Sequence, residues 1–377
     1  MGGAAQSGSS ALLVVLSGGL AVFLVILAFL IYRTGQSAPA YERLSRWGSG
    51  LSLVFGTLLL LFCFLEVIAR VMIPGGYLKR RPHRGSDPGA IVETLPDGRA
   101  YWEYRGDQGF DEAGMREAPV VADAVWRLGV MGDSVTYGVG VPAEKRFIHL
   151  LAGSLEQRCG PVQLMDAAVP GYSLHQERLA TERKVLPRQP DLLFVGVYSN
   201  DTVQFTVIGS TAYDVRVNLE QGFPVFSFLP LPDVVNALLL QHSVFYQWMT
   251  LRGMAATDKV SGREDQLLTM ALDDLNEMRR ACVAQGCRMV VALFPELDEP
   301  LSGPEPDGTA RFYGALRAWA TTAGVPIIDV RQMLAQEDYL KVRLDECCHY
   351  NEDGHARVAA GLEKEFDRLG LLPAPCR

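Results

Sequence analysis

The chain begins with two long apolar runs. Ala11–Tyr32 (ALLVVLSGGLAVFLVILAFLIY) contains 22 residues and no charge, and Trp47–Leu65 is also uncharged and continues in largely apolar sequence to Ile73. An α-helix of about 20 apolar residues crosses the hydrocarbon core of a bilayer. Both runs are too long and too uniformly apolar for a core helix. The first also lacks the basic region and the clear small-residue cleavage site of a signal peptide.

We therefore predict two transmembrane helices, at about residues 11–32 and 48–73, within a membrane anchor formed by residues 1–75. Glu66 and Arg70 interrupt the end of the second apolar run, four positions apart. On a helix this spacing brings the two side chains together, so that they can pair near the membrane surface.

From residue 127 onward, short β-rich runs alternate with helical periodicity. The expected strands are Leu128–Met131, Val162–Met165, Leu192–Val197, Met289–Phe294 and Pro326–Val330. The expected helices are Phe147–Gln157, Glu177–Val185, Glu264–Ala284, Thr309–Thr322 and a last helix, Ala356–Leu369. Buried strands that alternate with helices indicate a parallel sheet covered on both faces. We predict an α/β fold, a three-layer sandwich with a flavodoxin-like parallel sheet, over residues 127–377.

Two segments do not follow this alternation. Residues 76–126 contain glycine, proline and polar residues with little periodicity, and we expect a spacer that ends as an irregular lid or edge on the domain. Residues 201–259 are aromatic and aliphatic but not strand-like throughout, and they are too long for a plain connection. We interpret them as an insertion, which is either a lid, a substrate-contacting element or a structural helix packed on the sheet.

The charge balance is acidic, with a net charge of −8 at pH 7 and a sequence pI near 5.4. Such a chain does not suit a nucleic-acid surface, so we expect no nucleic-acid partner. The segment Arg33–Arg46 between the apolar runs holds three arginines. The flank after the second run is also basic, with Arg70, Lys79, Arg80, Arg81 and Arg84. Counting basic residues therefore does not favour an outside location for the large domain and slightly opposes it.

The cysteines add a second indication of compartment. Cys63 lies in the second apolar run, and the others are Cys159, Cys282, Cys287, Cys347, Cys348 and Cys376. This even number suits disulfides in an oxidising compartment, with the connectivity open. Cys282 and Cys287 flank the end of a predicted helix and can be bridged, whereas adjacent cysteines such as Cys347 and Cys348 seldom bridge without strain. No pair has zinc-type spacing. We expect an extracytoplasmic, periplasmic location for the large domain and no metal.

Candidate chemistry starts at residues 127–140, RLGVMGDSVTYGVG, where an apolar run stops at Gly132-Asp133-Ser134. Turns favour these residue types for reasons of backbone geometry alone. A serine nucleophile also needs a base within hydrogen-bond reach and donors aimed at the developing oxyanion. Asp133 is expected to stabilise the turn, and the role of Ser134 depends on partners elsewhere in the chain.

His349 is the best candidate for the base. It lies in LDECCHYNEDGHARVAAGL, directly before the last helix, where Asn351 or Asp353 can act as N-cap. Asp345 and Glu346 precede the histidine by four and three positions, and either carboxylate can hold the imidazole through its other nitrogen.

The other histidines fit structural roles better. His149 lies in a helical run and His242 in the insertion, so each is expected to be a packing or surface residue. Capping and surface roles account for His355. Two further positions offer donors: Gly171, on the turn in VPGYSLHQE, and Asn200, at the end of the strand in LLFVGVYSNDT.

These blocks, taken together, resemble the SGNH (GDSL-type) hydrolase superfamily over roughly Leu128 to the C-terminus. GDSVTYG, VPGYS, SND and DECCHYNEDGH occur in the family's order. The resemblance implies that Ser134 is the nucleophile and that His349 is the general base and then the general acid. It also implies an oxyanion hole built from the backbone N–H groups of Ser134 and Gly171 and the side-chain amide of Asn200.

Two positions depart from the family's pattern. The family's acid stands three residues before the histidine, where this chain has Glu346, and Asp345 lies one residue further back. We favour Asp345, with one extra loop residue, because its shorter side chain holds the imidazole more tightly. The family usually has glycine two residues before Asn200, where this chain has Tyr198.

The sequence thus predicts a membrane-tethered serine esterase or deacylase that forms an acyl-serine intermediate and requires no cofactor. Its expected partners are the lipid bilayer and an acylated small molecule or glycan of the cell envelope. An O-acyltransferase with a glycan acceptor is the alternative. A non-catalytic binding module is a third hypothesis, which the intact Ser134, Asn200 and His349 disfavour.

Overall fold

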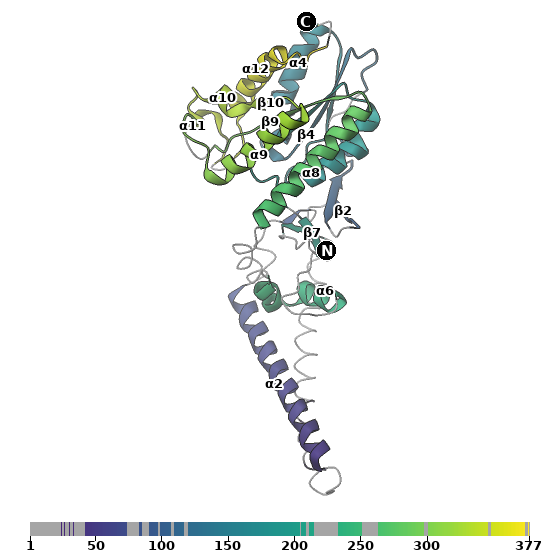
Figure 1. Ribbon diagram of the computed structural model, residues 1–377, viewed down its shortest axis with the longest axis vertical. Coiled ribbons are helices and arrows are strands. Elements are labelled where there is room, and N and C mark those ends of the chain that lie inside the picture. The colour runs from purple at the N-terminus through teal and green to yellow at the C-terminus, as the bar shows by residue number, and fades with distance from the viewer. Residues whose placement is uncertain are drawn as a thin grey trace. The chain divides into compact units, whose positions relative to one another are not determined.

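The computed structural model (Figure 1) describes 13 segments of the chain and the helical residues Leu24, Ile26, Leu30 and Arg33. The segments are residues 42–73, 83–84, 90–96, 99–106, 109–116, 120–203, 205–208, 211–214, 233–250, 263–297, 301–345, 348–373 and 376. The chain divides into two compact units. The helical unit comprises residues 1–83 and 217–260, and the sheet unit comprises residues 84–216 and 261–377. The chain therefore passes between the two units three times.

The sheet unit is built on a five-stranded parallel sheet, as the sequence predicts. Its strand order is β10-β9-β6-β4-β5. The strands are β4 (Trp126–Gly132), β5 (Val162–Asp166), β6 (Leu192–Val197), β9 (Arg288–Leu293) and β10 (Ile327–Asp329). The central strand β6 is buried along its whole length. The carboxyl ends of all five strands lie at one edge of the sheet because the strands are parallel.

Helices cover both faces of this sheet and make a three-layer α/β sandwich. One core contains Val195 of β6 and the apolar residues of α5 (Leu174–Ala180), α8 (Arg263–Ala284) and α9 (Asp307–Ala323). The opposite core contains Phe194. It receives side chains from α4 (Phe147–Cys159) and α12 (Glu352–Arg368). Neighbouring residues of a strand point to opposite faces, which accounts for the two cores.

Short elements complete the sheet unit. A π-helix (Thr181–Val185) and a 3₁₀-helix (Leu186–Arg188) continue α5, and a second 3₁₀-helix (Ala143–Lys145) precedes α4. The shorter α-helices are α3 (Ser134–Tyr137), α10 (Val330–Leu334) and α11 (Tyr339–Val342). Strands β7 (Phe205–Ile208) and β8 (Thr211–Asp214) pair antiparallel, and β1 (His83–Arg84) lies at the division between the units.

The expected spacer contains an ordered hairpin that its sequence pattern did not reveal. Strands β2 (Ala90–Thr94) and β3 (Ala100–Tyr104) pair antiparallel, and all five residues of β3 are buried. Tyr101 and Trp102 belong to the same core as α5. The hairpin is therefore part of the sheet unit's packing and not only an irregular edge.

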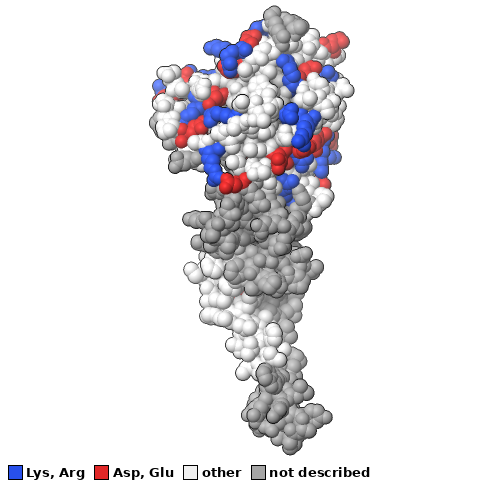
Figure 2. All heavy atoms as spheres, viewed as in Figure 1, with Lys and Arg blue, Asp and Glu red and all other residues white. Residues whose placement is uncertain are grey.

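The helical unit contains α2 (Glu42–Met72), which matches the second apolar run. Within the described residues, Ser49–Met72 is the one helix long and apolar enough to cross a membrane. Many of its large apolar side chains are exposed, and the part of the helical unit that is not grey in Figure 2 is largely white. The predicted pairing of Glu66 with Arg70 is present at 2.7 Å. The first predicted membrane helix lies, apart from Leu24, Ile26 and Leu30, outside the described part of the chain.

The sheet unit presents a mixed surface. On the face seen in Figure 2, basic and acidic side chains are interspersed and no large field has a single sign. Within the helical unit, α6 (Asp233–His242) and a following helical turn at residues 244–250 come from the predicted insertion.

The sheet unit contains a short-range and a long-range disulfide. The predicted Cys282–Cys287 bridge is present at the end of α8, and Cys159 at the end of α4 is bonded to Cys376. Cys348 is also disulfide-bonded, whereas Cys63 takes part in no disulfide. The Cys159–Cys376 bridge fastens the C-terminal residues to the helix layer formed by α4 and α12.

Loss of the Cys159–Cys376 bridge is expected to destabilise the protein. The bridge joins residues 217 positions apart, so replacing both cysteines with serine should lower the free energy of unfolding by about 2–5 kcal/mol. Thermal melting of the detergent-solubilised chain measures the change. The matched control is the double serine variant of Cys282 and Cys287. The disulfide between these cysteines joins residues only 5 positions apart, so its loss should cause a smaller shift of the melting temperature. Equal shifts for the two variants would contradict the loop-length argument.

Candidate active site

The stretch GDSVTYG forms a capped single turn of helix at the carboxyl end of β4. The Asp133 side chain accepts a hydrogen bond from the Val135 N–H at 2.9 Å and caps the start of α3. Gly138 ends the turn in the left-handed region, with φ 73°, which glycine adopts without strain. The turn thus forms as its composition predicts, and it places the Ser134 hydroxyl at the sheet edge.

Close packing holds this turn against the sheet. Thr136 is fully buried, and its side chain lies directly against Gly132 of β4 and Gly196 of β6. A Cβ atom at either glycine would collide with Thr136. Glycine at these two positions therefore allows the first helical residues to sit on the ends of two neighbouring strands.

His349 lies in a loop that is fixed at both ends. The Leu344 N–H donates to the His349 carbonyl at 2.7 Å, and Arg343 and Tyr350 form an isolated antiparallel bridge. Asn351 caps α12 by accepting from the Gly354 N–H at 2.9 Å, which selects it over Asp353 as the capping residue. The start of α12 thereby determines where the imidazole lies.

Ser134, His349 and Asp345 come together across the sequence. Ser134 Oγ lies 3.0 Å from His349 Nε2, although the two residues are 215 positions apart. The other ring nitrogen, Nδ1, is hydrogen-bonded to Asp345 Oδ2. The second carboxylate oxygen, Oδ1, accepts from the backbone N–H groups of Cys348 (3.0 Å) and His349 (3.2 Å). Glu346 lies outside the described residues.

These hydrogen bonds define a path for proton transfer from the Ser134 hydroxyl to His349. The carboxylate holds the proton on Nδ1, so Nε2 is free to accept the serine hydroxyl proton. The Asp345 side chain is 41% exposed and the His349 side chain is 18% exposed, so the chain of three residues lies at the surface of the sheet edge. Such a geometry can deprotonate the Ser134 hydroxyl for attack on a carbonyl carbon.

Besides the Ser134 N–H, the other two expected oxyanion donors lie at the same edge of the sheet. Gly171 follows β5 and has φ 80°, and Asn200 follows β6. Gly171 is buried, and its N–H donates to no acceptor in the described part of the chain. Asn200 is exposed, and no hydrogen bond of its side chain occurs among the described residues. A backbone N–H that is buried without a partner is unusual, and it marks a position where a ligand oxygen can bind.

Backbone hydrogen bonds join the three loops at this edge. The Val169 N–H donates to the Gly132 carbonyl at 3.1 Å, and the Leu174 N–H donates to the Asp201 carbonyl at 3.1 Å. The Asp201 carboxylate also accepts from the Tyr198 N–H at 2.7 Å. Tyr198, which stands where the family usually has glycine, is buried in the core on the α4 and α12 face.

Sequence reasoning missed the residues that fix the Gly171 loop. Tyr172 is buried, and its hydroxyl donates to the Trp102 carbonyl of β3 at 2.5 Å. The Gln176 amide donates to the Ala100 carbonyl at 2.6 Å, and Ser173 with Gln176 forms a capping box at the start of α5. The capping box is readable from Ser-x-x-Gln, but the pairing with β3 has no local sequence signal.

Three carboxyl groups are buried behind the serine turn. Burial raises the pKa of Asp133 to about 6, although its hydrogen bond with Val135 opposes the shift. Burial and then the nearby Asp133 raise the pKa of Glu177 well above its usual range, and neither Glu177 oxygen has a hydrogen-bond partner within the described residues. Burial followed by Glu177 also raises the pKa of Asp201. Asp133 therefore serves as the expected turn cap in an apolar, carboxyl-rich environment.

His355 is structural, as expected, but it is buried and not at the surface. Its Nδ1 accepts from the Phe147 N–H at 3.0 Å, and its ring stacks on the Phe147 ring with centroids 5.5 Å apart. It thus caps α4 from the neighbouring helix. Burial lowers the pKa of His355 to about 4, with Arg146 adding to the shift.

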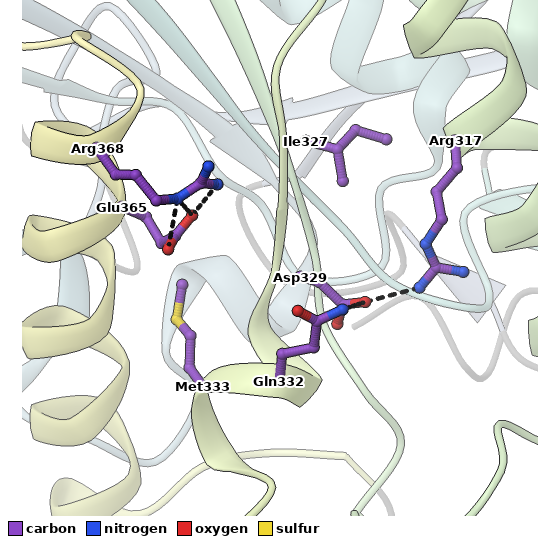
Figure 3. Close-up of a pocket in the computed structure, with 7 residues that line it drawn as sticks. All are labelled: Arg317, Ile327, Asp329, Gln332, Met333, Glu365 and Arg368. Carbon is purple, nitrogen blue, oxygen red and sulfur yellow. Dashed lines mark hydrogen bonds and ion pairs between the residues drawn. The ribbon is translucent and has the colours of Figure 1, made fainter.

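Two other features do not add a ligand site. The ligand atoms of Asp345, Cys348 and His349 lie within 4.8 Å of one another, but Cys348 is disulfide-bonded and cannot be a thiolate ligand. A hollow of about 520 Å³ lies at the β10 edge (Figure 3). Arg317 pairs there with Asp329, and Arg368 pairs with Glu365, so these charges neutralise one another.

Ser134, His349 and Asp345 are hydrogen-bonded in series at the carboxyl edge of the parallel sheet. This arrangement, in a three-layer sandwich, defines an α/β enzyme with a hydrolase-type site. Residues 130–357 match the GDSL-like lipase/acylhydrolase family. Because this match covers more than half of the chain, the protein belongs to that family and is an ester-bond hydrolase. No curated protein matches the chain.

The chain also matches solved structures at low sequence identity and with TM-scores of 0.40–0.41. A putative lipolytic protein of the G-D-S-L family from Desulfitobacterium hafniense DCB-2 is 10% identical, with 63% of this chain and 98% of that chain covered and a TM-score of 0.40. A lipolytic G-D-S-L protein from Veillonella parvula DSM 2008 is 16% identical (64% and 98% covered, TM-score 0.40). A catalytic mutant of Axe2, an acetylxylan esterase from Geobacillus stearothermophilus, is 13% identical (64% and 94% covered, TM-score 0.41).

The buried His355 predicts a loss of stability on the acid side of neutrality. Its folded pKa lies below the ordinary 6.5, so the unfolded chain binds the extra proton, and stability falls as the pH drops from 6.5 towards 4. Between pH 7 and pH 5 this group should cost about 2 kcal/mol. Denaturant unfolding at both pH values should show a smaller difference for His355→Asn, which can still accept from Phe147. An unchanged pH dependence in the variant would contradict this assignment.

Proposed function

We propose that the protein is a membrane-tethered serine esterase that removes an ester-linked acyl group from a carbohydrate or other cell-envelope substrate through an acyl-serine intermediate. The observation that carries the proposal is the 3.0 Å contact between Ser134 Oγ and His349 Nε2, with Asp345 on the opposite ring nitrogen. A base oriented in this way generates a serine nucleophile at neutral pH.

In the acylation step, Ser134 Oγ attacks the ester carbonyl carbon while its proton moves to His349 Nε2. Asp345 stabilises the imidazolium that forms and keeps the ring in place. The tetrahedral intermediate collapses when the bond from carbon to the alcohol oxygen breaks, and the imidazolium gives its proton to that leaving oxygen. The products of this step are a free hydroxyl on the substrate and an acyl-Ser134 ester.

The oxyanion of the tetrahedral intermediate requires donors at the same edge. We assign this role to the N–H groups of Ser134 and Gly171 and to the Asn200 amide. Gly171 is a buried residue, and its N–H has no acceptor among the described residues, which supports the assignment. Each such donor acts on charge that develops in the transition state, where removing one costs about 100-fold or more in rate.

Deacylation repeats the chemistry with water as the nucleophile. His349 takes a proton from water, the hydroxide attacks the acyl carbon, and the acid is released as Ser134 recovers its proton. The exposure of Asn200 and Asp345 supports access of water to the acyl-enzyme and favours hydrolysis over transfer to a glycan hydroxyl.

A tether and an oxidising location support a cell-envelope substrate. The apolar helix Ser49–Met72 has the length of a membrane span. Disulfides at Cys159–Cys376, Cys282–Cys287 and Cys348 suit a compartment outside the cytosol. An enzyme held at a membrane in such a compartment meets acylated glycans and lipid-linked material.

Replacing the nucleophile is the first test. Ser134→Ala should lower the hydrolysis of p-nitrophenyl acetate by about 10⁴-fold or more and abolish labelling by a fluorophosphonate, because Ser134 is the hydroxyl that contacts His349 Nε2 among the described residues. Ser154→Ala, on α4, is the matched control and should retain both activities. Undiminished hydrolysis or labelling in Ser134→Ala would exclude the assignment.

The acid of the site can be identified by paired variants. Asp345→Asn should lower kcat by about 10⁴-fold, because the amide disturbs the imidazole tautomer, whereas Glu346→Gln should retain most activity. Steady-state kinetics with the same chromogenic ester compares them. The opposite ranking would transfer the role to Glu346.

Product analysis separates hydrolysis from transfer. With an acetylated oligosaccharide and an unacylated glycan acceptor present together, mass spectrometry should detect free acetate and no newly acylated acceptor. Acylated acceptor as the main product would establish the O-acyltransferase alternative.

A further inference from the structure

Glu66, near the end of α2, is the centre of a buried polar contact within the helical unit. Its side chain is 1% exposed. The carboxylate accepts hydrogen bonds from Ser243 Oγ at 2.7 Å and from the N–H groups of Val244 and Phe245, each at 3.0 Å. It also pairs with Arg70 at 2.7 Å. Together these donors compensate the buried negative charge of the Glu66 carboxylate. The contact is therefore a specific part of the packing of the helical unit.

The same contact joins α2 to both sides of a bend in the inserted segment. Arg70 donates to the carbonyl of His242, the last residue of α6, at 2.7 Å. Glu66 binds the first N–H groups of the next helical turn, which Ser243 also caps through the Tyr246 N–H at 3.0 Å. Two charged side chains, one turn apart on α2, thus hold the end of one element and the start of the next.

Glu66 needs these partners because of its depth in the apolar helix. At 1.5 Å per residue, Glu66 lies about 26 Å along the helix from Ser49, close to the far boundary of a hydrocarbon core of about 30 Å. A carboxylate at that level is costly unless it is paired. The donors at residues 243–245 therefore lie at the same level as the carboxylate, at the boundary between acyl chains and headgroups.

The inserted segment presents an apolar surface that continues that of α2. The Phe62 and Phe245 rings meet edge to face at 5.9 Å, and Phe245 stacks with Trp248 at 6.2 Å. Three of its large apolar side chains are exposed, Val235, Leu238 and Trp248. On α2, the exposed apolar residues reach Val71 and Met72. Residues 233–250 contain a single charged residue, Asp233.

We propose that α6 and residues 243–250 form an interfacial membrane segment, which lies in the headgroup boundary of the bilayer and is fastened to α2 by Glu66. The occupant of its exposed apolar surface is lipid. Three features support this choice: the surface is continuous with the apolar surface of α2, its near absence of charge suits acyl chains, and a tryptophan at its edge suits the interface. The inference rests on the proposed membrane span of α2.

Depth-dependent fluorescence quenching tests the inference on the full chain. Leu238, 50% exposed on α6, is replaced by cysteine in a Cys63→Ser background and labelled with a nitrobenzoxadiazole dye. The protein is reconstituted in phosphatidylcholine/phosphatidylglycerol vesicles with or without lipid carrying a shallow doxyl group. The matched control is a label at Leu340, 53% exposed on α11. We expect doxyl lipid to lower the emission at position 238 by about twofold or more and to leave position 340 nearly unchanged.

The outcomes separate the two proposals. Protein that does not float with the vesicles overturns both the membrane span and the interfacial segment. Protein that floats but shows no quenching at position 238 overturns the interfacial segment alone. A blue-shifted label without doxyl quenching also overturns it, because a protein partner or a second copy then covers the surface.

Glu66→Gln tests the fastening. The variant keeps the side-chain shape and loses the charge, so quenching at position 238 should fall towards that of the Leu340 control. Hydrolysis of the chromogenic ester reports that the sheet unit of the variant is folded. Undiminished quenching in Glu66→Gln would overturn the role given to the carboxylate.

Discussion

The hydrogen bond between Ser134 Oγ and His349 Nε2 is the constraint on which the site depends, and the rest of the sheet unit serves to maintain it. Ser134 is placed by β4, whereas His349 is placed by the start of α12. The core on the α4 and α12 face holds these two elements in fixed positions relative to each other. His355, six residues after His349 and in the first turn of α12, stacks on Phe147 and accepts its N–H, so it fixes the start of the helix that follows the His349 loop.

The sequence predicts those parts of the molecule whose signals are local. Short stretches of sequence identify the buried strands, the capped Ser134 turn and the histidine ahead of the last helix. The acid is different, because spacing alone leaves Asp345 and Glu346 open. In the structure, one oxygen of Asp345 accepts two loop N–H groups while the other holds the imidazole, a folding of the loop that no linear pattern contains. The hairpin around Trp102 is unpredictable for the same reason, since its burial depends on Tyr172, far along the chain.

The region behind the Ser134 turn shows a compromise between stability and placement. Asp133, Glu177 and Asp201 are buried together, and burial raises the pKa of each carboxyl group. Groups in this state weaken the fold, because they give up hydration for few partners. Two of them nevertheless have a positioning role: Asp133 caps the serine turn, and Asp201 accepts from Tyr198 in the loop that carries Asn200. The loops at the sheet edge are thus positioned by carboxyl groups whose burial is unfavourable for the stability of the fold.

With α2 as the proposed membrane span, the three passages of the chain between the units have a consequence for proteolysis. An enzyme attached by one N-terminal linker is shed when that linker is cut. Here a nick within residues 74–82 leaves the sheet unit covalently continuous with residues 217–260, which remain clasped to α2 through Glu66 and Arg70. Release of the sheet unit into solution would require a second cut or the loss of the contacts that Glu66 and Arg70 make with residues 242–245. This attachment therefore resists shedding by a single proteolytic cut.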